Sequence, residues 1–213
     1  MQIFWQGYTS IRIETKQGDK AGELVTDPFE NESAIRFPRT VEPEMVVLSN
    51  QERKDFNLEG VAGKPFIVSD PGEYEVRGIF AYGIQDPIAD AGEKRPVVYR
   101  IEAEDISIGF LGKLNRKLTD VELEHLGNID ILVLPVGGGD GMDAKTAAAV
   151  VNMIEPRIVI PINYQIPGIK AKLDSVDAFC KATGGKRQDG NRLKISKKEL
   201  PADDTLIMVI ERS

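Results

Sequence analysis

The fold is decided by residues 129–138, which read IDILVLPVGG. The apolar run is short and rich in β-branched residues, which is typical of a buried strand. A glycine-rich loop follows at residues 137–141, and Ala147, Val150, Val151 and Ile154 then recur at helical spacing. Pro156 ends that helix, and residues 157–162 form another apolar run. This order predicts alternating strands and helices in the second half of the chain.

The first half has the pattern of strands. Ile3 and Trp5, then Ile11 and Ile13, alternate with polar residues as half-buried strands do. Further strands are predicted at 24–26, 45–48, 65–68, 79–84, 97–101 and 106–110, with a hairpin turn at 104–105. Thr119 and Glu122 have the spacing of a capping box, so a short helix is predicted to start there and to stop at Gly127.

The last part of the chain is predicted to hold one more helix and two strands. Leu173, Val176, Phe179 and Cys180 mark the apolar stripe of the helix, which is predicted to end at the glycine pair 184–185. The two strands are predicted around 193–196 and 206–210. We found no linker or low-complexity tract, so residues 1–213 are predicted to form a single domain that is strand-rich early and alternating late.

The composition is that of a soluble globular protein. The formal net charge is −7 and the isoelectric point is near 5.0, which disfavours broad attraction to nucleic acid or to an anionic membrane. No segment has the ~20 apolar residues that span a bilayer. Cys180 is the only cysteine, and the N-terminus does not resemble a secretory signal, so we expect a cytoplasmic protein.

Five motifs together resemble the metallo-β-lactamase superfamily, and specifically its small bacterial branch of Zn-dependent hydrolases. They are WQGYTS at 5–10, VTDP at 25–28, PGEYEVRG at 71–78, IDILVLPVGG at 129–138 and IPINY at 160–164. The resemblance runs through nearly the whole chain. It implies an α+β fold of the four-layer αββα type, with two mixed sheets packed face to face and helices outside.

The resemblance also implies where metal ligands should lie, and this chain has other residues there. The His, His, Asp and His positions of the family's histidine motif correspond to Asn50, Glu52, Lys54 and Asp55. The next ligand histidine corresponds to Gln85, which precedes Asp86; the bridging carboxylate corresponds to Lys113, and the last ligand histidine to Asn163. The only histidine of the chain, His125, lies outside all of these positions.

These replacements change the chemistry that the site can support. Zinc takes neutral imidazoles, thiolates and carboxylates, whereas an amide oxygen is a poor ligand and a protonated lysine has no lone pair to donate. We expect Lys54 and Lys113 to point positive charge into a cavity that holds dications in relatives. Without a metal, nothing lowers the pKa of a bound water to near 7. We therefore expect no catalytic residue, no metal and no cofactor.

Alternatives remain for the altered cleft, which we define as Asn50, Glu52, Lys54, Asp55, Gln85, Asp86, Lys113 and Asn163. Glu52, Asp55 and Asp86 are the right residue types for an oxygen-rich Mg²⁺ or Ca²⁺ site. The simpler interpretation is that these acids pair with Arg53, Lys54 or Lys113. Lys113 acting as a base is a further hypothesis.

Four other features have simpler structural interpretations. Asp27 fits a turn residue at a strand end, and the glycine loop 137–141 lacks both nucleotide-binding motifs although a helix follows it. His125 is predicted to be a solvated surface residue and Cys180 a buried small hydrophobe. The basic residues between Lys186 and Lys198 are interrupted by acids, so a solvated edge is favoured over a nucleic-acid site.

The sequence thus predicts a non-catalytic, metal-free protein of this fold that works as a binding or assembly module. Its partner would be an unknown small molecule or protein, and a homo-oligomer is compatible with the sequence. The alternative is a metal-dependent hydrolase of an ester or phosphodiester with an altered, oxygen-rich site.

Overall fold

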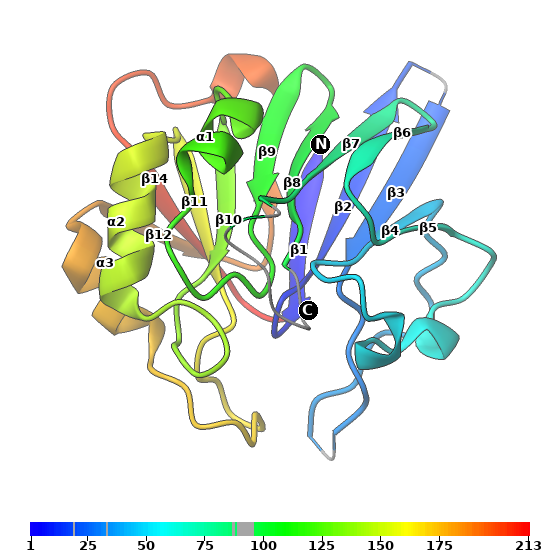
Figure 1. Cartoon of the computed structure of the whole chain (residues 1–213), viewed down its shortest axis with the longest axis horizontal. Coiled ribbons are helices and arrows are strands. Elements are labelled where there is room, and N and C mark those ends of the chain that lie inside the picture. The colour runs from blue at the N-terminus through cyan, green and yellow to red at the C-terminus, as the bar shows by residue number, and fades with distance from the viewer. Residues whose placement is uncertain (19, 33, 87, 89–95) are drawn as a thin grey trace.

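Two mixed β-sheets pack face to face in a computed structural model of the chain, which describes residues 1–18, 20–32, 34–86, 88 and 96–213 (Figure 1). The six-stranded sheet has the order β13-β1-β2-β3-β4-β5. Its strands are β1 (Gln2–Gly7), β2 (Ser10–Gln17), β3 (Lys20–Thr26), β4 (Met45–Val47), β5 (Phe66–Val68) and β13 (Leu193–Lys194). Strands β3, β4 and β5 run parallel and the others antiparallel.

The eight-stranded sheet has the order β12-β14-β11-β10-β9-β8-β7-β6. Its strands are β6 (Gly72–Val76), β7 (Ile79–Ile84), β8 (Val98–Ala103), β9 (Ile106–Phe110), β10 (Ile131–Pro135), β11 (Ile158–Ile162), β12 (Lys186–Gly190) and β14 (Leu206–Ile210). The half from β12 to β9 is parallel and the half from β9 to β6 is antiparallel. The expected α+β sandwich of two mixed sheets is confirmed.

Three α-helices cover the outer face of the eight-stranded sheet in Figure 1: α1 (Asp120–Leu126), α2 (Ala144–Ile154) and α3 (Val176–Thr183). The predicted capping box at the start of α1 is confirmed, with both reciprocal bonds between Thr119 and Glu122. Gly127 and Gly184 are the C-caps of α1 and α3, as predicted. In the part of the chain described, no helix is long and apolar enough to cross a bilayer.

The outer face of the six-stranded sheet is covered differently. Among the described residues its cover consists of connecting segments and two 3₁₀ turns, η1 (Arg53–Asp55) and η2 (Leu58–Gly60), rather than α-helices. A separate apolar cluster fills this side: Val25, Phe37, Val41, Val46, Leu48, Phe56 and Val61. The connections contain Pro28, Pro38 and Pro43, which interrupt helical hydrogen bonding and explain the absence of a regular helix there.

The start of one predicted helix differs from the structure, and strands β6 and β12 were not predicted. Helix α3 begins at Val176, with Ser175 as its N-cap, so Leu173 lies before the helix and not on its stripe. Strand β12 was not predicted, because four of its five residues are exposed and polar and the strand is held by backbone pairing to β14. Cys180 is half-buried and not buried as predicted.

The two sheets share one core between their inner faces. Trp5 stacks on Tyr164 with the ring centroids 4.5 Å apart, which joins β1 of one sheet to the end of β11 of the other. The Trp5 indole nitrogen donates to the carbonyl oxygen of Tyr8 at 2.9 Å, and the backbone N of Asn163 donates to that same oxygen at 2.9 Å. The sheets are therefore tied together at the carboxyl ends of β1 and β11.

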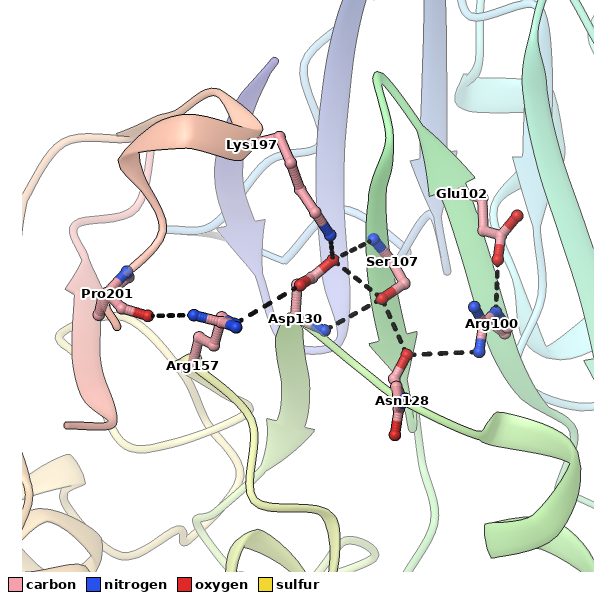
Figure 2. A network of polar contacts seen from close by, with 8 residues as sticks. All are labelled: Arg100, Glu102, Ser107, Asn128, Asp130, Arg157, Lys197 and Pro201. Carbon is pink, nitrogen blue, oxygen red and sulfur yellow. Dashed lines mark hydrogen bonds and ion pairs between the residues drawn. The ribbon is translucent and has the colours of Figure 1, made fainter. Parts of the chain in front are cut away.

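A network of polar contacts lies at the other end of the central strands of the larger sheet, at the start of β10 (Figure 2). Asp130 Oδ2 accepts hydrogen bonds from Lys197 Nζ at 2.7 Å, from Ser107 N at 2.9 Å and from Ser107 Oγ at 3.0 Å. Lys197 belongs to the 3₁₀ turn η3 (Lys197–Glu199), so the network joins β9, β10 and the C-terminal segment. It lies at the amino end of β10, away from the site described next.

Candidate functional site

A cavity of about 240 Å³ opens at the carboxyl ends of the central strands, where connections from both sheets meet. In Figure 1 these connections gather along the lower edge of the molecule. The cavity is lined by Tyr8, Thr9, Asp27, Pro28, Phe29, Glu30, Glu32, Asp55, Phe56, Lys113, Asp140, Asn163, Ala171 and Leu173. Binding sites in sandwich and α/β folds often use this edge, because the loops there are free to carry polar residues.

Asp27 forms the floor of the cavity and is only 1% exposed. Its Oδ1 accepts a hydrogen bond from Ser49 N and its Oδ2 one from Ser49 Oγ, both at 2.7 Å. Burial raises the pKa of Asp27, while the bonds from Ser49 and the nearby Lys113 ammonium oppose the rise. The predicted structural role of Asp27 agrees with these contacts, because they fix the start of the segment that follows β4.

Among the described residues that line the cavity, Lys113 has the only basic side chain. Its Nζ lies 5.2 Å from the centre of the Phe56 ring, a cation–π contact. Among the described residues it forms no ion pair; its electrostatic partner is Asp27. The Lys113 backbone N donates to Ser49 Oγ at 3.3 Å, so Ser49 connects the lysine to Asp27.

Three residues that line the cavity have left-handed backbone conformations. The φ angles are 49° for Tyr8, 39° for Asp27 and 52° for Asn163, and Gly112, which precedes Lys113, has φ of 48°. Left-handed geometry costs about 1–3 kcal/mol for a residue other than glycine, and such strain is concentrated at functional sites. Asp and Asn adopt this geometry more readily than other residues, so Tyr8 is the most strained of the three.

Three members of the altered cleft line this cavity: Asp55, Lys113 and Asn163. The other five do not line it. Asn50 is buried and its Oδ1 accepts from Glu52 N at 2.7 Å. Lys54 points into solvent, with 81% of its side chain exposed, and lies 3.5 Å from the Glu52 carboxylate. The expectation that Lys54 directs positive charge into the cavity is wrong, because the turn η1 carries Asp55 inward and Lys54 outward.

Gln85 and Asp86 are held by contacts with the chain near them. Gln85 Nε2 donates to the carbonyl oxygen of Pro96 at 3.3 Å, and Asp86 Oδ1 accepts from Ile88 N at 2.9 Å. Asp86 is 7% exposed. These bonds tie Gln85 to Pro96 and Asp86 to Ile88.

The residues present do not fit the dications that this fold holds in its metal-dependent members. In the ranges that the structure describes, no group of three or more His, Cys, Asp or Glu side chains is placed to hold a metal ion. Where the resemblance places a bridging carboxylate, the cavity has the Lys113 ammonium, which repels a dication and donates no lone pair while protonated. The oxygen-rich set of Glu52, Asp55 and Asp86 contributes only Asp55 to the cavity.

The sequence did not single out the acidic and aromatic wall of the cavity. Glu30 and Glu32 come from the connection between β3 and β4, and Asp140 comes from the loop after β10. Tyr8, Phe29 and Phe56 supply aromatic surface, and Tyr8 meets Phe29 edge-on at 5.2 Å. The available signal was their position: each follows the carboxyl end of a strand in the central part of a sheet.

The remaining candidates have structural roles. The loop 137–141 leads to helix α2, but the N-terminus of that helix is capped by Asp143, whose Oδ1 accepts from Thr146 N at 2.7 Å. His125 is exposed, as predicted, with its Nδ1 2.7 Å from the carbonyl oxygen of Val121. Within the basic C-terminal edge, Arg187 pairs with Asp177 and Asp189, and Lys197 pairs with Asp130.

Comparison with known proteins gives the class to which this architecture belongs. A family model described as a β-lactamase superfamily domain matches residues 2–163, so the chain belongs to the β-lactamase superfamily. The match ends at Asn163, the last of the altered ligand positions.

Particular relatives agree with this assignment. The chain is 27% identical to a candidate Zn-dependent hydrolase of the metallo-β-lactamase superfamily from Thermotoga maritima, whose crystal structure matches with a TM-score of 0.78 over 99% of each chain. It is 22% identical over 189 residues to a UPF0173 protein of Pyrococcus furiosus, which covers 77% of this chain and 83% of the relative. It is 30% identical over 99 residues to a UPF0173 metal-dependent hydrolase of Pyrococcus horikoshii, over 44% of each chain.

Proposed function

We propose that this protein is a non-catalytic, metal-free member of the superfamily that works as a binding module. The observation that carries the proposal is the Lys113 side chain, which lines the cavity and interacts with buried Asp27. The family resemblance implies a bridging metal ligand at this position. A lysine there supplies a fixed positive charge to the buried carboxylate without any metal. It also removes the means of making a metal-bound hydroxide, which is the nucleophile of metal-dependent hydrolysis.

The occupant that we favour is a small molecule bound in the cavity. A volume of about 240 Å³, walls of mixed apolar and polar character and strained backbone at Tyr8 and Asn163 all support such a site. The second form of this proposal, which we favour less, is an assembly role through the outer surface, including formation of a homo-oligomer. The single half-buried cysteine agrees with our expectation of a reducing compartment such as the cytoplasm.

Elemental analysis of the purified protein tests this proposal. We expect Zn, Mn, Fe and Ni far below one ion per chain, even after growth in medium supplemented with each metal. The matched comparison is a variant with the ligand residues restored, in which Lys113→Asp, Asn163→His, Asn50→His and Gln85→His are combined. Stoichiometric metal in the natural chain would overturn the proposal.

The alternative function is a metal-dependent hydrolase, which the printed names of several relatives favour. In this chain Asp55 is the member of the oxygen-rich set that reaches the cavity. The test is hydrolysis of bis(p-nitrophenyl) phosphate and p-nitrophenyl acetate with Mg²⁺ or Mn²⁺. Activity that is lost in Asp55→Ala would establish the alternative, whereas we expect no turnover above that of a heat-inactivated sample.

A further inference from the structure

The side chains of two donor residues, Lys113 and Asn163, line the cavity without a hydrogen bond or an ion pair to any residue that the structure describes. Asn163 is 4% exposed, lines the cavity, and its side-chain amide forms no hydrogen bond with the residues that the structure describes. An amide in this position needs a hydrogen-bond partner from water or from a ligand. Over the same part of the chain, the Lys113 ammonium has the Phe56 ring beneath it but no ion pair. Both groups are suited to receive an anionic group of a ligand.

The other polar residues of the lining, Tyr8, Glu30, Glu32 and Asp140, which we call the acidic wall, bring acceptors and negative charge to the cavity. Glu32 Oε2 and the Tyr8 hydroxyl are buried; neither meets hydrogen-bond geometry with a described residue, although the two groups lie close enough for Glu32 to act on the Tyr8 hydroxyl. Burial, followed by the neighbouring Glu32 carboxylate, raises the pKa of Tyr8 to about 12, so its hydroxyl keeps its proton at neutral pH. Glu30 and Asp140 add carboxylates at the rim. This wall is suited to receive a cationic group.

The mixed charges of the lining disfavour ligands of a single charge. A simple anion would satisfy Lys113 and Asn163 but would share the cavity with five acidic side chains, those of Asp27, Glu30, Glu32, Asp55 and Asp140. A simple cation would satisfy Glu32 but would meet the Lys113 ammonium and leave the Asn163 amide without a partner. A buried charge or polar group without a partner is costly in either case. A ligand that carries both signs satisfies Lys113 and Asn163 as well as the acidic wall.

We propose, building on the metal-free binding function above, that the cavity binds a small zwitterion of the amino-acid type. Its carboxylate would contact Lys113 and Asn163, and its ammonium would contact Glu32 and the Tyr8 hydroxyl. The cavity of about 240 Å³ is smaller than the ~300 Å³ at which pockets for drug-sized ligands begin, so the ligand is small. Phe29, Leu173 and Pro28 add apolar surface, which suits an apolar side chain.

Three matched probes test the requirement for both charges. L-valine is the zwitterion, L-valinamide lacks the carboxylate, and 3-methylbutanoate lacks the ammonium. Titration calorimetry on the full chain should give L-valine an affinity at least tenfold higher than either analogue. L-alanine and L-leucine are measured beside L-valine, and whichever binds best is compared with its own amide and acid. The proposal is overturned if none of the three binds at millimolar concentration, or if a singly charged analogue binds as tightly.

Single-residue variants test which side chains contact the carboxylate and which contact the ammonium of the ligand. Lys113→Met and Asn163→Asp should each lower the affinity for the amino acid at least tenfold, and Asn163→Asp keeps a residue that tolerates left-handed φ. Glu32→Gln should lower it similarly while keeping the shape of the side chain. Lys54→Met, which removes an exposed lysine outside the cavity, should leave the affinity unchanged. If Lys113→Met binds as the natural chain does, the proposed carboxylate contact is wrong.

Elemental analysis of the same preparation separates this inference from the function on which it rests. A metal-free protein that does not discriminate between the three probes contradicts the zwitterion alone. A protein with stoichiometric metal contradicts the metal-free function whatever the probes do. Circular dichroism spectra and urea midpoints of each variant show that a lost affinity does not come from unfolding.

Discussion

The ammonium of Lys113 lies 5.2 Å from the centre of the Phe56 ring, in the cavity that Asp55 and Asn163 also line. The contact joins a residue that follows β9 in one sheet to a residue that follows η1 beside the other sheet. A desolvated cation–π contact contributes on the order of 1–2 kcal/mol. Lys113 thus supplies the positive charge of the cavity and helps to hold its two sides together.

Replacing Lys113 should change how stability depends on pH. Burial raises the pKa of Asp27 in the folded chain, so the folded state binds this proton more tightly than the unfolded state does. The contribution of Asp27 is therefore greatest below its unfolded pKa of about 3.9 and is lost as pH rises through the folded pKa. Lys113→Met removes the charge interaction that opposes the rise in the Asp27 pKa. Between acid and neutral pH, the free energy of unfolding of this variant should therefore fall by about 1 kcal/mol more than that of the natural chain.

Urea unfolding between about pH 4 and pH 8 measures this effect through linkage. Lys54→Met is the control, because Lys54 is exposed and does not line the cavity. Identical pH profiles for Lys113→Met and Lys54→Met would show that Lys113 does not interact with Asp27.

The backbone before Lys113 should tolerate no side chain. A Cβ at Gly112 would lie 2.0 Å from the Ser49 Cβ, and its φ is 48°. Gly112→Ala should therefore lower the free energy of unfolding by about 3 kcal/mol or more, from strain and overpacking together. The matched control is Gly184→Ala, which has φ of 66° and open space around it, so only the left-handed strain of about 1 kcal/mol should appear. If the two variants lose equal free energy of unfolding, steric contact with Ser49 is not what destabilises Gly112→Ala.

The network in Figure 2 should protect the fold against acid. Burial raises the pKa of Asp130, but the bonds from Lys197 and Ser107 outweigh it and hold the pKa below its usual value. Its stabilising contribution is therefore present above the unfolded pKa of about 3.9 and is lost as pH falls through the folded pKa. Asp130→Asn should raise the midpoint of acid unfolding.

Lys197→Met should raise that midpoint by less than Asp130→Asn, because half of the Lys197 side chain is exposed and the pair is screened by solvent. The difference is read from the fluorescence of Trp5 during acid titration. An unchanged midpoint in Asp130→Asn would mean that other carboxylates control acid unfolding.

A buried ion pair should anchor helix α1. The Glu122 side chain is fully buried, and its two carboxylate oxygens accept from the Nη atoms of Arg116 at 2.8 and 2.9 Å. Arg116→Met should lower the free energy of unfolding by about 3 kcal/mol, because it leaves the carboxylate buried without this partner. The double variant Arg116→Met with Glu122→Gln should recover part of the loss in thermal unfolding. No recovery would indicate that Arg116 acts through its other contacts.

Local sequence patterns predicted most of the fold, because each of the confirmed elements has its own signal. Alternating apolar residues located β1 and β2, and the capping box located the start of α1. Strand β12 had no such signal, since an exposed edge strand is held by its backbone. The start of α3 was misplaced because Leu173 continues the helical spacing while serving the cavity.

The site could be predicted only in part. The resemblance located Asp55, Lys113 and Asn163, which the structure brings to one cavity. It could not show that η1 turns Lys54 outward, because neighbours along a tight turn diverge in direction. Glu30 and Glu32 lie in the long connection between β3 and β4, which carries no regular pattern, and Tyr8 lies in the tight turn between β1 and β2, where nothing in the pattern indicated that it lines a cavity.

Anomalous diffraction at the zinc edge, from crystals grown with excess Zn²⁺, tests the absence of a metal centre most directly. We expect no anomalous peak among Asp27, Lys113 and Asn163, and ordered density for the Lys113 side chain beside Phe56. Two neighbouring zinc peaks at full occupancy in that cavity would contradict our account.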